Sequence, residues 1–175
     1  MTNMTILYFL VNKIRKITKN FSREKCFKEY ADIHRIVILF DLEHAEDVKD
    51  FAKSLKFAGK EVFCFSYNPN AKDEGSVLPE NFTVLNRKQL YFNGFPHQQV
   101  MEHFKSLHPD TLLDLTVQPH PVLQYLSLKS EASYRVGFHR EEKTFDDLLL
   151  EYDPEQSFVF LTSQLHFYMK SIRSK

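Results

Sequence analysis

The segment of residues 110–138 restricts the possible folds more than any other part of the chain. An apolar strand over residues 110–117 ends in polar residues, a short amphipathic helix follows, and a second strand over residues 134–138 contains Gly137. Parallel neighbouring strands need a crossover connection, which is usually a helix, whereas antiparallel strands are joined by tight hairpins. A strand–helix–strand order is therefore typical of two parallel strands in one sheet. The segment therefore predicts a parallel α/β sheet, and by itself it predicts no reaction.

The same alternation of strands and helices extends along the rest of the chain. Apolar runs rich in β-branched and aromatic residues predict further strands at residues 35–41, 61–67, 82–85 and 147–152. Helical periodicity predicts helices over residues 43–56, 97–107, 121–130 and from Pro154 to about residue 172, and residues 68–81 predict an exposed loop. We therefore expect an α/β fold, a three-layer, doubly wound, mostly parallel sheet of the Rossmann-like or flavodoxin-like type.

The N-terminal residues predict an amphipathic helix ahead of the sheet. Apolar residues recur there at helical spacing with basic residues on the other face, namely Ile6, Leu7, Leu10, Ile14 and Ile17 against Lys13, Arg15, Lys16 and Lys19. We expect this helix in residues 1–28 and a single Rossmann-like domain in residues 29–175. Three roles remain open for the helix: packing on the domain, docking a protein partner, or weak peripheral contact with an anionic membrane. Its apolar run is too short for a transmembrane segment, and its charges follow that run, which argues against a signal peptide.

Charge and cysteine content limit the partners and the compartment. The chain has 23 basic and 23 acidic residues, so no net field attracts nucleic acid, and we expect no nucleic-acid partner. Cys26 and Cys64 form neither a metal-binding spacing nor a disulfide framework. This cysteine use is typical of a reducing compartment, and we expect a cytoplasmic protein.

The motifs that bind common cofactors and metals are missing from the sequence. Its four glycines, at positions 59, 75, 94 and 137, include no two within six residues, so neither a GxGxxG fingerprint nor a P-loop can be formed. His97, His103 and His108 are six and five residues apart, a spacing that does not align them on one helix face. We therefore expect no cofactor and no metal site.

Polar residues at the ends of the predicted strands are the candidates for a ligand site. In doubly wound sheets the ligand lies beyond the carboxyl ends of the strands. Those ends supply Asp41, Ser66, Tyr67, Asn68, Thr116, Gln118, His120, His139 and Arg140, and the mid-strand carboxylate Asp114 joins them. We single out four residues as the speculative ligand-binding set: Asp41, Asp114, Thr116 and His120.

Asp114 and His120 each have a functional and a structural interpretation. Asp114 shares a strand face with Leu112 and Thr116, and a buried carboxylate there needs partners. It either serves as a base or ligand anchor, or accepts hydrogen bonds from hydroxyls and backbone amides. His120 lies between two prolines in a stiff loop beyond a strand end, where it either contacts a ligand or is an exposed loop residue.

The sequence Asp41-Leu42-Glu43 resembles the first motif of haloacid-dehalogenase-type phosphatases, in which an apolar strand ends in Asp-x-Asp. That resemblance implies Asp41 as a nucleophile, with a later acidic pair such as Asp146-Asp147 helping to hold Mg²⁺. The chain departs from the family in carrying Glu43 where the second Asp usually stands. Acidic residues near a helix start also stabilise the helix dipole without any chemistry.

The order RIVILFD, GKEVFCFSY, NGFP, DTLLDLT, YLSLKSEASYRVGF and DLLLEYD resembles an uncharacterised bacterial family, a domain of unknown function. The resemblance covers nearly the whole chain and implies a small, Rossmann-like cytoplasmic protein without established catalytic residues. More distantly, DTLLDLT followed by a helix and YRVGF is similar to the N-terminal, acceptor-side half of heptosyltransferase-type glycosyltransferases. Such enzymes need a second Rossmann-like half for the nucleotide sugar, and we expect no room for it in 175 residues.

Two functional hypotheses follow, and enzymatic activity stays open between them. The preferred one is a non-catalytic binding or protein-interaction module, because the cofactor loops, nucleophile motifs and metal set are missing. The alternative is a small-ligand-binding domain or enzyme, phosphatase-like or glycosyltransferase-related, with its site at the strand ends. A pocket that gathers the four singled-out residues would favour a ligand, whereas a filled strand end with an exposed apolar N-terminal helix would favour a protein partner.

Overall fold

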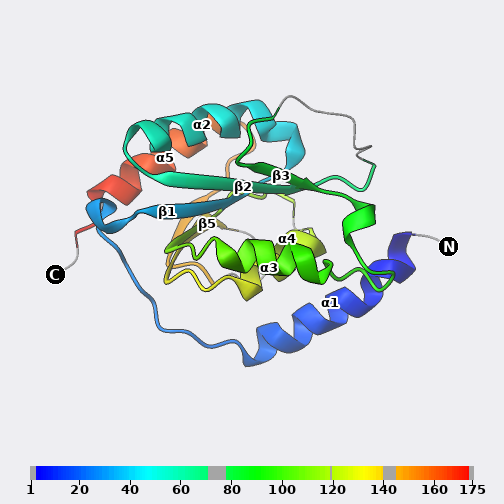
Figure 1. Ribbon diagram of the computed structural model, residues 1–175. Helices are drawn as coiled ribbons and strands as arrows, with labels where there is room; N and C mark the ends of the chain where they lie inside the picture. The colour runs from blue at the N-terminus through cyan, green and yellow to red at the C-terminus, as the bar shows by residue number, and fades with distance from the viewer. Residues whose placement is uncertain (1–2, 71–77, 119, 140–144, 174–175) are drawn as a thin grey trace.

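Six parallel strands form one sheet in the order β3-β2-β1-β4-β5-β6 (Figure 1). The computed structural model describes residues 3–70, 78–118, 120–139 and 145–173, with side chains from residue 7. The strands are β1 (Arg35–Leu39), β2 (Glu61–Tyr67), β3 (Phe82–Leu85), β4 (Thr111–Asp114), β5 (Tyr134–His139) and β6 (Leu148–Glu151). The expected α/β class is confirmed, and this strand order is the Rossmann-like one of the two types considered.

The central strand β1 explains why the sheet is buried on both faces. Its side chains alternate between two apolar cores, with Ile36 and Ile38 in one and Val37 and Leu39 in the other. All four side chains are fully buried. A continuous apolar run therefore forms a strand here because each face has a core to fill.

Helices cover both faces of the sheet and complete the three layers (Figure 1). On one face lie α2 (Ala45–Phe57) and α5 (Phe158–Ser171), and on the other lie α3 (Gln98–Ser106) and α4 (Pro121–Lys129). The amphipathic pattern of α2 is the simplest case, because its buried residues are four of those that the sequence places on one face: Val48, Phe51, Ala52 and Leu55.

The N-terminal helix α1 (Asn3–Asn20) lies outside α4 as an additional layer (Figure 1). Leu10 is completely buried in the core on that side, and Leu7 and Ile14 pack against the same core. The basic residues of α1 remain on its outer side, as the sequence pattern predicts. Within the described part of the chain, no helix combines the length and the apolar character that crossing a bilayer requires.

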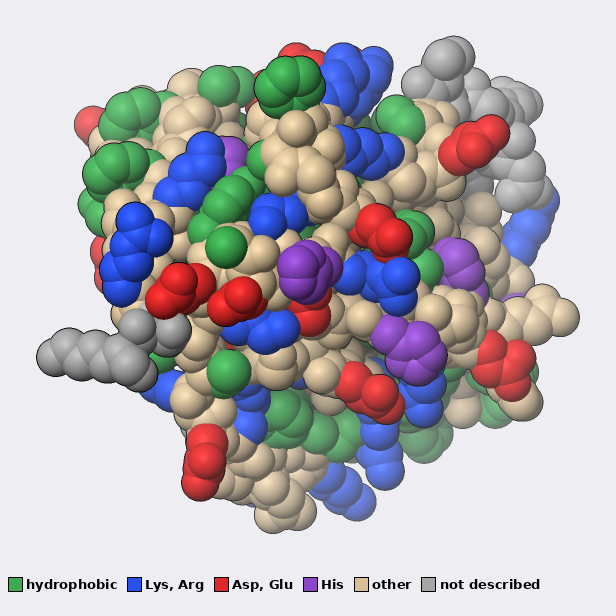
Figure 2. Space-filling model, turned by 60° about the vertical axis from the view of Figure 1, so that its left-hand side comes forward, with side chains coloured by type: hydrophobic (Ala, Val, Ile, Leu, Met, Phe, Trp, Pro, Cys, Tyr) green, Lys and Arg blue, Asp and Glu red, His purple; other side chains and the backbone are tan. Residues whose placement is uncertain are grey.

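An extended segment after α1 connects it to β1 and is fastened to the far edge of the sheet. Arg23 donates through Nη1 to both carboxylate oxygens of Asp147 at 2.9 Å and to the carbonyl of Phe145 at 3.1 Å. The backbone amide of Cys26 donates to the same carboxylate at 3.0 Å. The contacts of this segment lie on the side of the molecule where the strands begin, and that surface carries interleaved basic and acidic side chains (Figure 2). The helix is thus held by the packing of its apolar face and by the segment that follows its C-terminal end.

Several element boundaries differ from the sequence-based expectations. The last helix begins after Ser157, whose Oγ accepts from the amide of Phe160 at 3.2 Å, so Pro154 does not start it. A hydroxyl is a better N-terminal cap than an exposed proline three residues earlier. The strand expected over residues 110–117 ends at Asp114, although Leu115 still donates to Leu39 at 2.8 Å. Residues 71–77 of the expected loop lie outside the described residues.

Candidate functional site at the strand carboxyl ends

A cavity of about 320 Å³ lies beyond the carboxyl ends of β1, β2 and β4. The chain winds from β1 outward through β2 to β3, and from β4 outward through β5 to β6. The β1–β4 boundary is therefore the topological switch point, where doubly wound sheets bind their ligands. We call this cavity the strand-end pocket, and its lining consists of Asp41, Leu42, Glu43, Tyr67, Asn68, Gln118, His120 and Leu123.

Asp41 joins the loop after β1 to the loop after β4. Its Oδ2 accepts from the backbone amides of Val117 at 2.6 Å and Gln118 at 3.2 Å. Burial raises the pKa of Asp41 and the nearby Glu43 adds to the rise, while the two backbone hydrogen bonds and His44 lower it. Among the described residues no donor reaches Oδ1, so one carboxylate oxygen is left for a pocket ligand.

His120 caps α4 and forms one wall of the pocket. Its Nδ1 accepts from the backbone amide of Val122 at 3.3 Å, which assigns the proton of the neutral ring to Nε2. The ring lies against Tyr67, with 4.2 Å between the ring centroids and 32° between the ring planes. Burial lowers the pKa of His120 to about 4, so the ring is neutral near pH 7 and offers an N–H donor.

Asp114 and Thr116 lie beneath the pocket and are absent from its lining. Asp114 is 4% exposed, and its Oδ1 accepts from the Thr116 backbone amide at 3.2 Å and from Thr116 Oγ1 at 2.5 Å. These are the hydroxyl and amide partners that the structural interpretation of Asp114 requires. Of the four singled-out residues, the structure brings Asp41 and His120 together at the pocket and leaves the other two below it.

The remaining strand-end candidates divide between the pocket and other places. Tyr67, Asn68 and Gln118 line the pocket. Ser66 is fully buried in β2, and His139 is exposed with Nδ1 3.3 Å from a carboxylate oxygen of Glu151. The last candidate, Arg140, lies outside the described residues.

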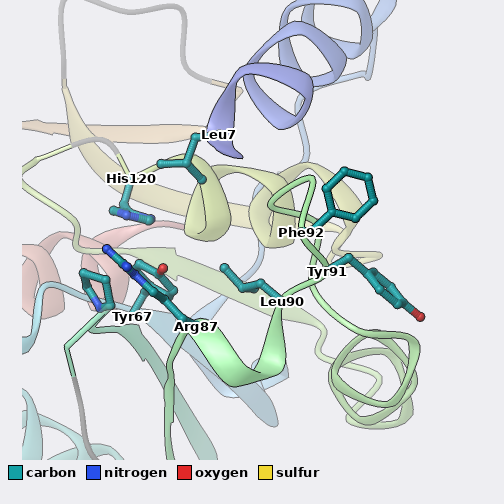
Figure 3. Close-up of a pocket in the computed structure, with 8 residues that line it drawn as sticks. Leu7, Tyr67, Arg87, Leu90, Tyr91, Phe92 and His120 are labelled. Carbon is teal, nitrogen blue, oxygen red and sulfur yellow. The ribbon is translucent and has the colours of Figure 1, made fainter. Parts of the chain in front are cut away.

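A second cavity of about 250 Å³ adjoins the first and was not anticipated from the sequence (Figure 3). We call it the apolar pocket, and its lining consists of Leu7, Tyr67, Pro69, Arg87, Leu90, Tyr91, Phe92 and His120. Tyr91 and Phe92 are 48% and 86% exposed, in a turn where apolar side chains have no core to fill. In the sequence, this pocket is indicated only by two adjacent aromatic residues, Tyr91 and Phe92, next to a predicted turn.

Asp147, one residue of the later acidic pair of the phosphatase resemblance, lies toward the amino ends of the strands, just before β6. Leu39, Asp114, Gly137 and Leu149 share one level of the ladder. Asp41 lies two residues beyond this level and Asp147 two residues before it, which separates them by about 13 Å along the strand direction. Asp147 instead receives Arg23 and the Cys26 and Arg135 amides. Within the described residues, no group of three or more His, Cys, Asp or Glu has the geometry to hold a metal ion.

A family model matches residues 7–172, which covers all six strands and most of α1. The chain belongs to DUF6913, a family of unknown function. The expectation of a domain of unknown function is thereby confirmed for nearly the whole chain. No curated protein matches the sequence.

Proposed function

We propose that this DUF6913 protein is a non-catalytic binding domain that holds a small molecule in the strand-end pocket. The observation that carries the proposal is the cavity at the switch point, where Asp41, Tyr67 and His120 converge from three different strand ends. Ligands of doubly wound domains occupy this crevice, because the two halves of the sheet diverge there.

The polar groups of the pocket favour a ligand that donates hydrogen bonds. Asp41 and Glu43 contribute two carboxylates, and the described lining contains no Lys or Arg. An alcohol or an amine satisfies such acceptors, whereas a phosphate or carboxylate is repelled by them. His120 Nε2 and the amides of Asn68 and Gln118 add further hydrogen-bonding groups.

The composition of the pocket also favours binding over covalent chemistry. Its described lining includes no Ser, Thr or Cys that a base could activate. His120 has Nδ1 engaged with a backbone amide, and its lowered pKa makes it a weak base. These groups suit recognition of a ligand.

Ligand-observed NMR on the full chain tests this proposal. The probes are glycerol and glucose as polyols, ethylamine as an amine, and acetate and phosphate as anions. We expect saturation transfer to a polyol or to ethylamine, lost in Asp41→Asn and retained in Asp50→Asn, whose carboxylate is 77% exposed on α2. Binding of the anions alone, or equal signals for Asp41→Asn and the unchanged protein, would contradict it.

A second candidate function, docking of a protein partner through α1, is favoured by one observation. Tyr8 and Phe9 are 62% and 58% exposed, although the neighbouring Leu10 is fully buried. The double substitution Tyr8→Ser and Phe9→Ser removes this apolar surface without touching the buried side of the helix. We expect it to abolish co-purification of the partner at an unchanged circular dichroism spectrum, and an unchanged set of co-purifying proteins would contradict docking.

Further expectations about the protein's setting rest on composition and resemblance. We infer a bacterial, cytoplasmic protein, since both cysteines are free and the family resemblance implies that source. We propose that residues 1–28 form the N-terminal amphipathic helix with its connection and that residues 29–175 form one Rossmann-like domain. The basic face of α1 supports weak peripheral contact with anionic lipid, and the balanced charge of the chain argues against a nucleic-acid partner. The heptosyltransferase similarity concerns only the β4–α4–β5 crossover.

A further inference from the structure

The two pockets share a wall made of two side chains. Tyr67, from the end of β2, and His120, from the start of α4, belong to both linings. Their rings lie against each other with 4.2 Å between centroids. Figure 3 shows Leu7 of α1 above this ring pair and Leu90 beside it. A ligand that passes over the ring pair therefore contacts both pockets.

The chemistry differs sharply on the two sides of this wall. The strand-end pocket contributes the carboxylates of Asp41 and Glu43. The apolar pocket contributes mainly aliphatic and aromatic carbon, including Leu7, Leu90 and Phe92. The strand-end pocket, at about 320 Å³, is near the lower limit of the usual size of small-molecule sites, and the apolar pocket, at about 250 Å³, is below it, so a ligand that occupies both has a site of ordinary size. One ligand with a polar and an apolar end fits this arrangement.

The charged groups set the direction in which such a ligand lies. Arg87 extends from the short helix after β3 and runs alongside Tyr67 toward His120 (Figure 3). Its positive charge lies beside the shared wall and the apolar pocket and disfavours a cationic group there, whereas the two carboxylates of the strand-end pocket favour one. The cationic end therefore belongs in the strand-end pocket and the apolar end beneath α1.

We propose that the protein binds an arylalkylamine, with the ammonium group against Asp41 and Glu43 and the aromatic group between Leu7, Leu90 and Phe92. This inference rests on the proposed function of the strand-end pocket and extends it to a class of ligand. The rings of Tyr67 and His120 lie under the alkyl chain, and α1 is the outer wall of the aromatic half. The exposed aromatic residues of the turn are then part of a binding surface.

Isothermal titration of the full chain near pH 7 with matched probes tests this inference. The probes are 2-phenylethylamine and 4-phenylbutylamine, ethylamine without the ring, and 3-phenylpropionate with an anionic end. We expect at least one phenylalkylamine to bind about tenfold or more tightly than ethylamine, and 3-phenylpropionate not to bind. Polyols and ethylamine are titrated in parallel as probes of the strand-end pocket alone.

Substitutions on each side of the wall localise the two ends of the ligand. Leu7→Trp fills the apolar pocket, and we expect it to weaken the phenylalkylamine about tenfold while leaving ethylamine unchanged. Tyr8→Trp is the matched control, because this neighbour on the same helix is 62% exposed and outside both linings. Asp41→Asn and Glu43→Gln should weaken both amines, and Glu43, 66% exposed, keeps the test valid if the Asp41 variant fails to fold.

Three results would overturn the inference, and they separate it from the proposed function. A phenylalkylamine no tighter than ethylamine refutes the aromatic half but leaves the strand-end pocket as a binding site. If the affinity for a phenylalkylamine is unchanged by Leu7→Trp, or unchanged by both carboxylate substitutions, then a single ligand does not span the two pockets. If neither the amines nor the polyols bind the unchanged protein, the proposed function fails as well.

Discussion

Asp41 lies beyond the carboxyl end of a central strand and Asp147 just before the amino end of an edge strand, and both carboxylates accept hydrogen bonds from backbone amides. Asp147 is fully buried and also receives both the Arg23 guanidinium and the Cys26 amide. Asp41 is half-buried, uses one oxygen for the loop after β4 and lines a cavity. The comparison shows what distinguishes a binding carboxylate from a structural one near a strand end. A binding role is indicated only when a carboxylate oxygen has no protein donor and the side chain lines a cavity.

The largest expected effect concerns the saturated carboxylate. Asp147→Asn removes the buried charge that balances Arg23 and leaves a part-buried guanidinium with backbone carbonyls as its only remaining acceptors among the described residues. We expect a loss of about 3 kcal/mol in the free energy of unfolding, measured by urea denaturation. The matched control is Asp50→Asn, at an exposed carboxylate paired only with Lys53, which should change stability by less than about 0.5 kcal/mol. Equal effects of the two substitutions would break the comparison.

A smaller effect is expected where β5 passes between two other acids. A Cβ at Gly137 would lie 3.0 Å from the backbone oxygen of Asp114 and 3.1 Å from Oδ2 of Asp146. Gly137→Ala should therefore cost about 1–3 kcal/mol, because neither the backbone nor the buried carboxylate moves freely. Gly59→Ala gives a comparison without crowding, since it meets no atom within 4 Å and costs only the strain of φ +82°, about 1–2 kcal/mol. Thermal denaturation showing a harmless Gly137→Ala would mean that this region is loosely packed.

The fall in the free energy of unfolding at acid pH should depend on His120, the histidine in the pocket wall. Because the pKa of His120 falls from 6.5 to about 4 on folding, its neutral form contributes stability that is complete above pH 6.5 and lost as pH falls toward 4. His166, whose pKa is also lowered to about 4, acts in the same window, so the comparison must be with a variant. His120→Asn keeps a cap for α4. We expect it to flatten the decline between pH 6.5 and 4 by on the order of 1 kcal/mol, allowing for partial exposure. Identical slopes would contradict the buried, neutral ring.

The smallest stability effect is expected at the carboxylate that we assign to the ligand. Asp41→Asn keeps an oxygen that accepts from Val117 and Gln118, so the free energy of unfolding should fall by less than about 1 kcal/mol. The same substitution should nevertheless weaken binding of ethylamine about tenfold. Urea denaturation and titration calorimetry measure the two effects separately. A large loss of stability would assign Asp41 to the same structural role as Asp147.

The fold could be predicted because local patterns determine it. The apolar run of β1 and the periodicity of α2 each require a buried environment on particular faces, and the sheet supplies both. Alternation along the strand also placed Asp114 and Thr116 on one face. Their mutual hydrogen bond could not be predicted, since it depends on the turn of the chain after β4.

The candidate site could be predicted only in part for a related reason. Asp41 and His120 each follow a strand end, so topology brings them to one crevice. The apolar pocket is assembled from α1, the end of β2, the turn after β3 and the start of α4, which are far apart in the sequence. No local pattern reports that these segments meet. The structural role of Asp147 was hidden in the same way, because its partner Arg23 is 124 residues away.

That separation also has a consequence for the order in which the protein assembles. At ordinary rates of translation, Arg23 is synthesised about 6–25 s before the aspartate that fastens it. The first helix therefore leaves the ribosome early, with an apolar face that has no neighbour until the β4–α4 unit and the last strands exist. Contacts between such distant residues form slowly, which makes docking of this helix a late step of folding. Chaperones and neighbouring nascent chains therefore meet this helix while its apolar face is still exposed.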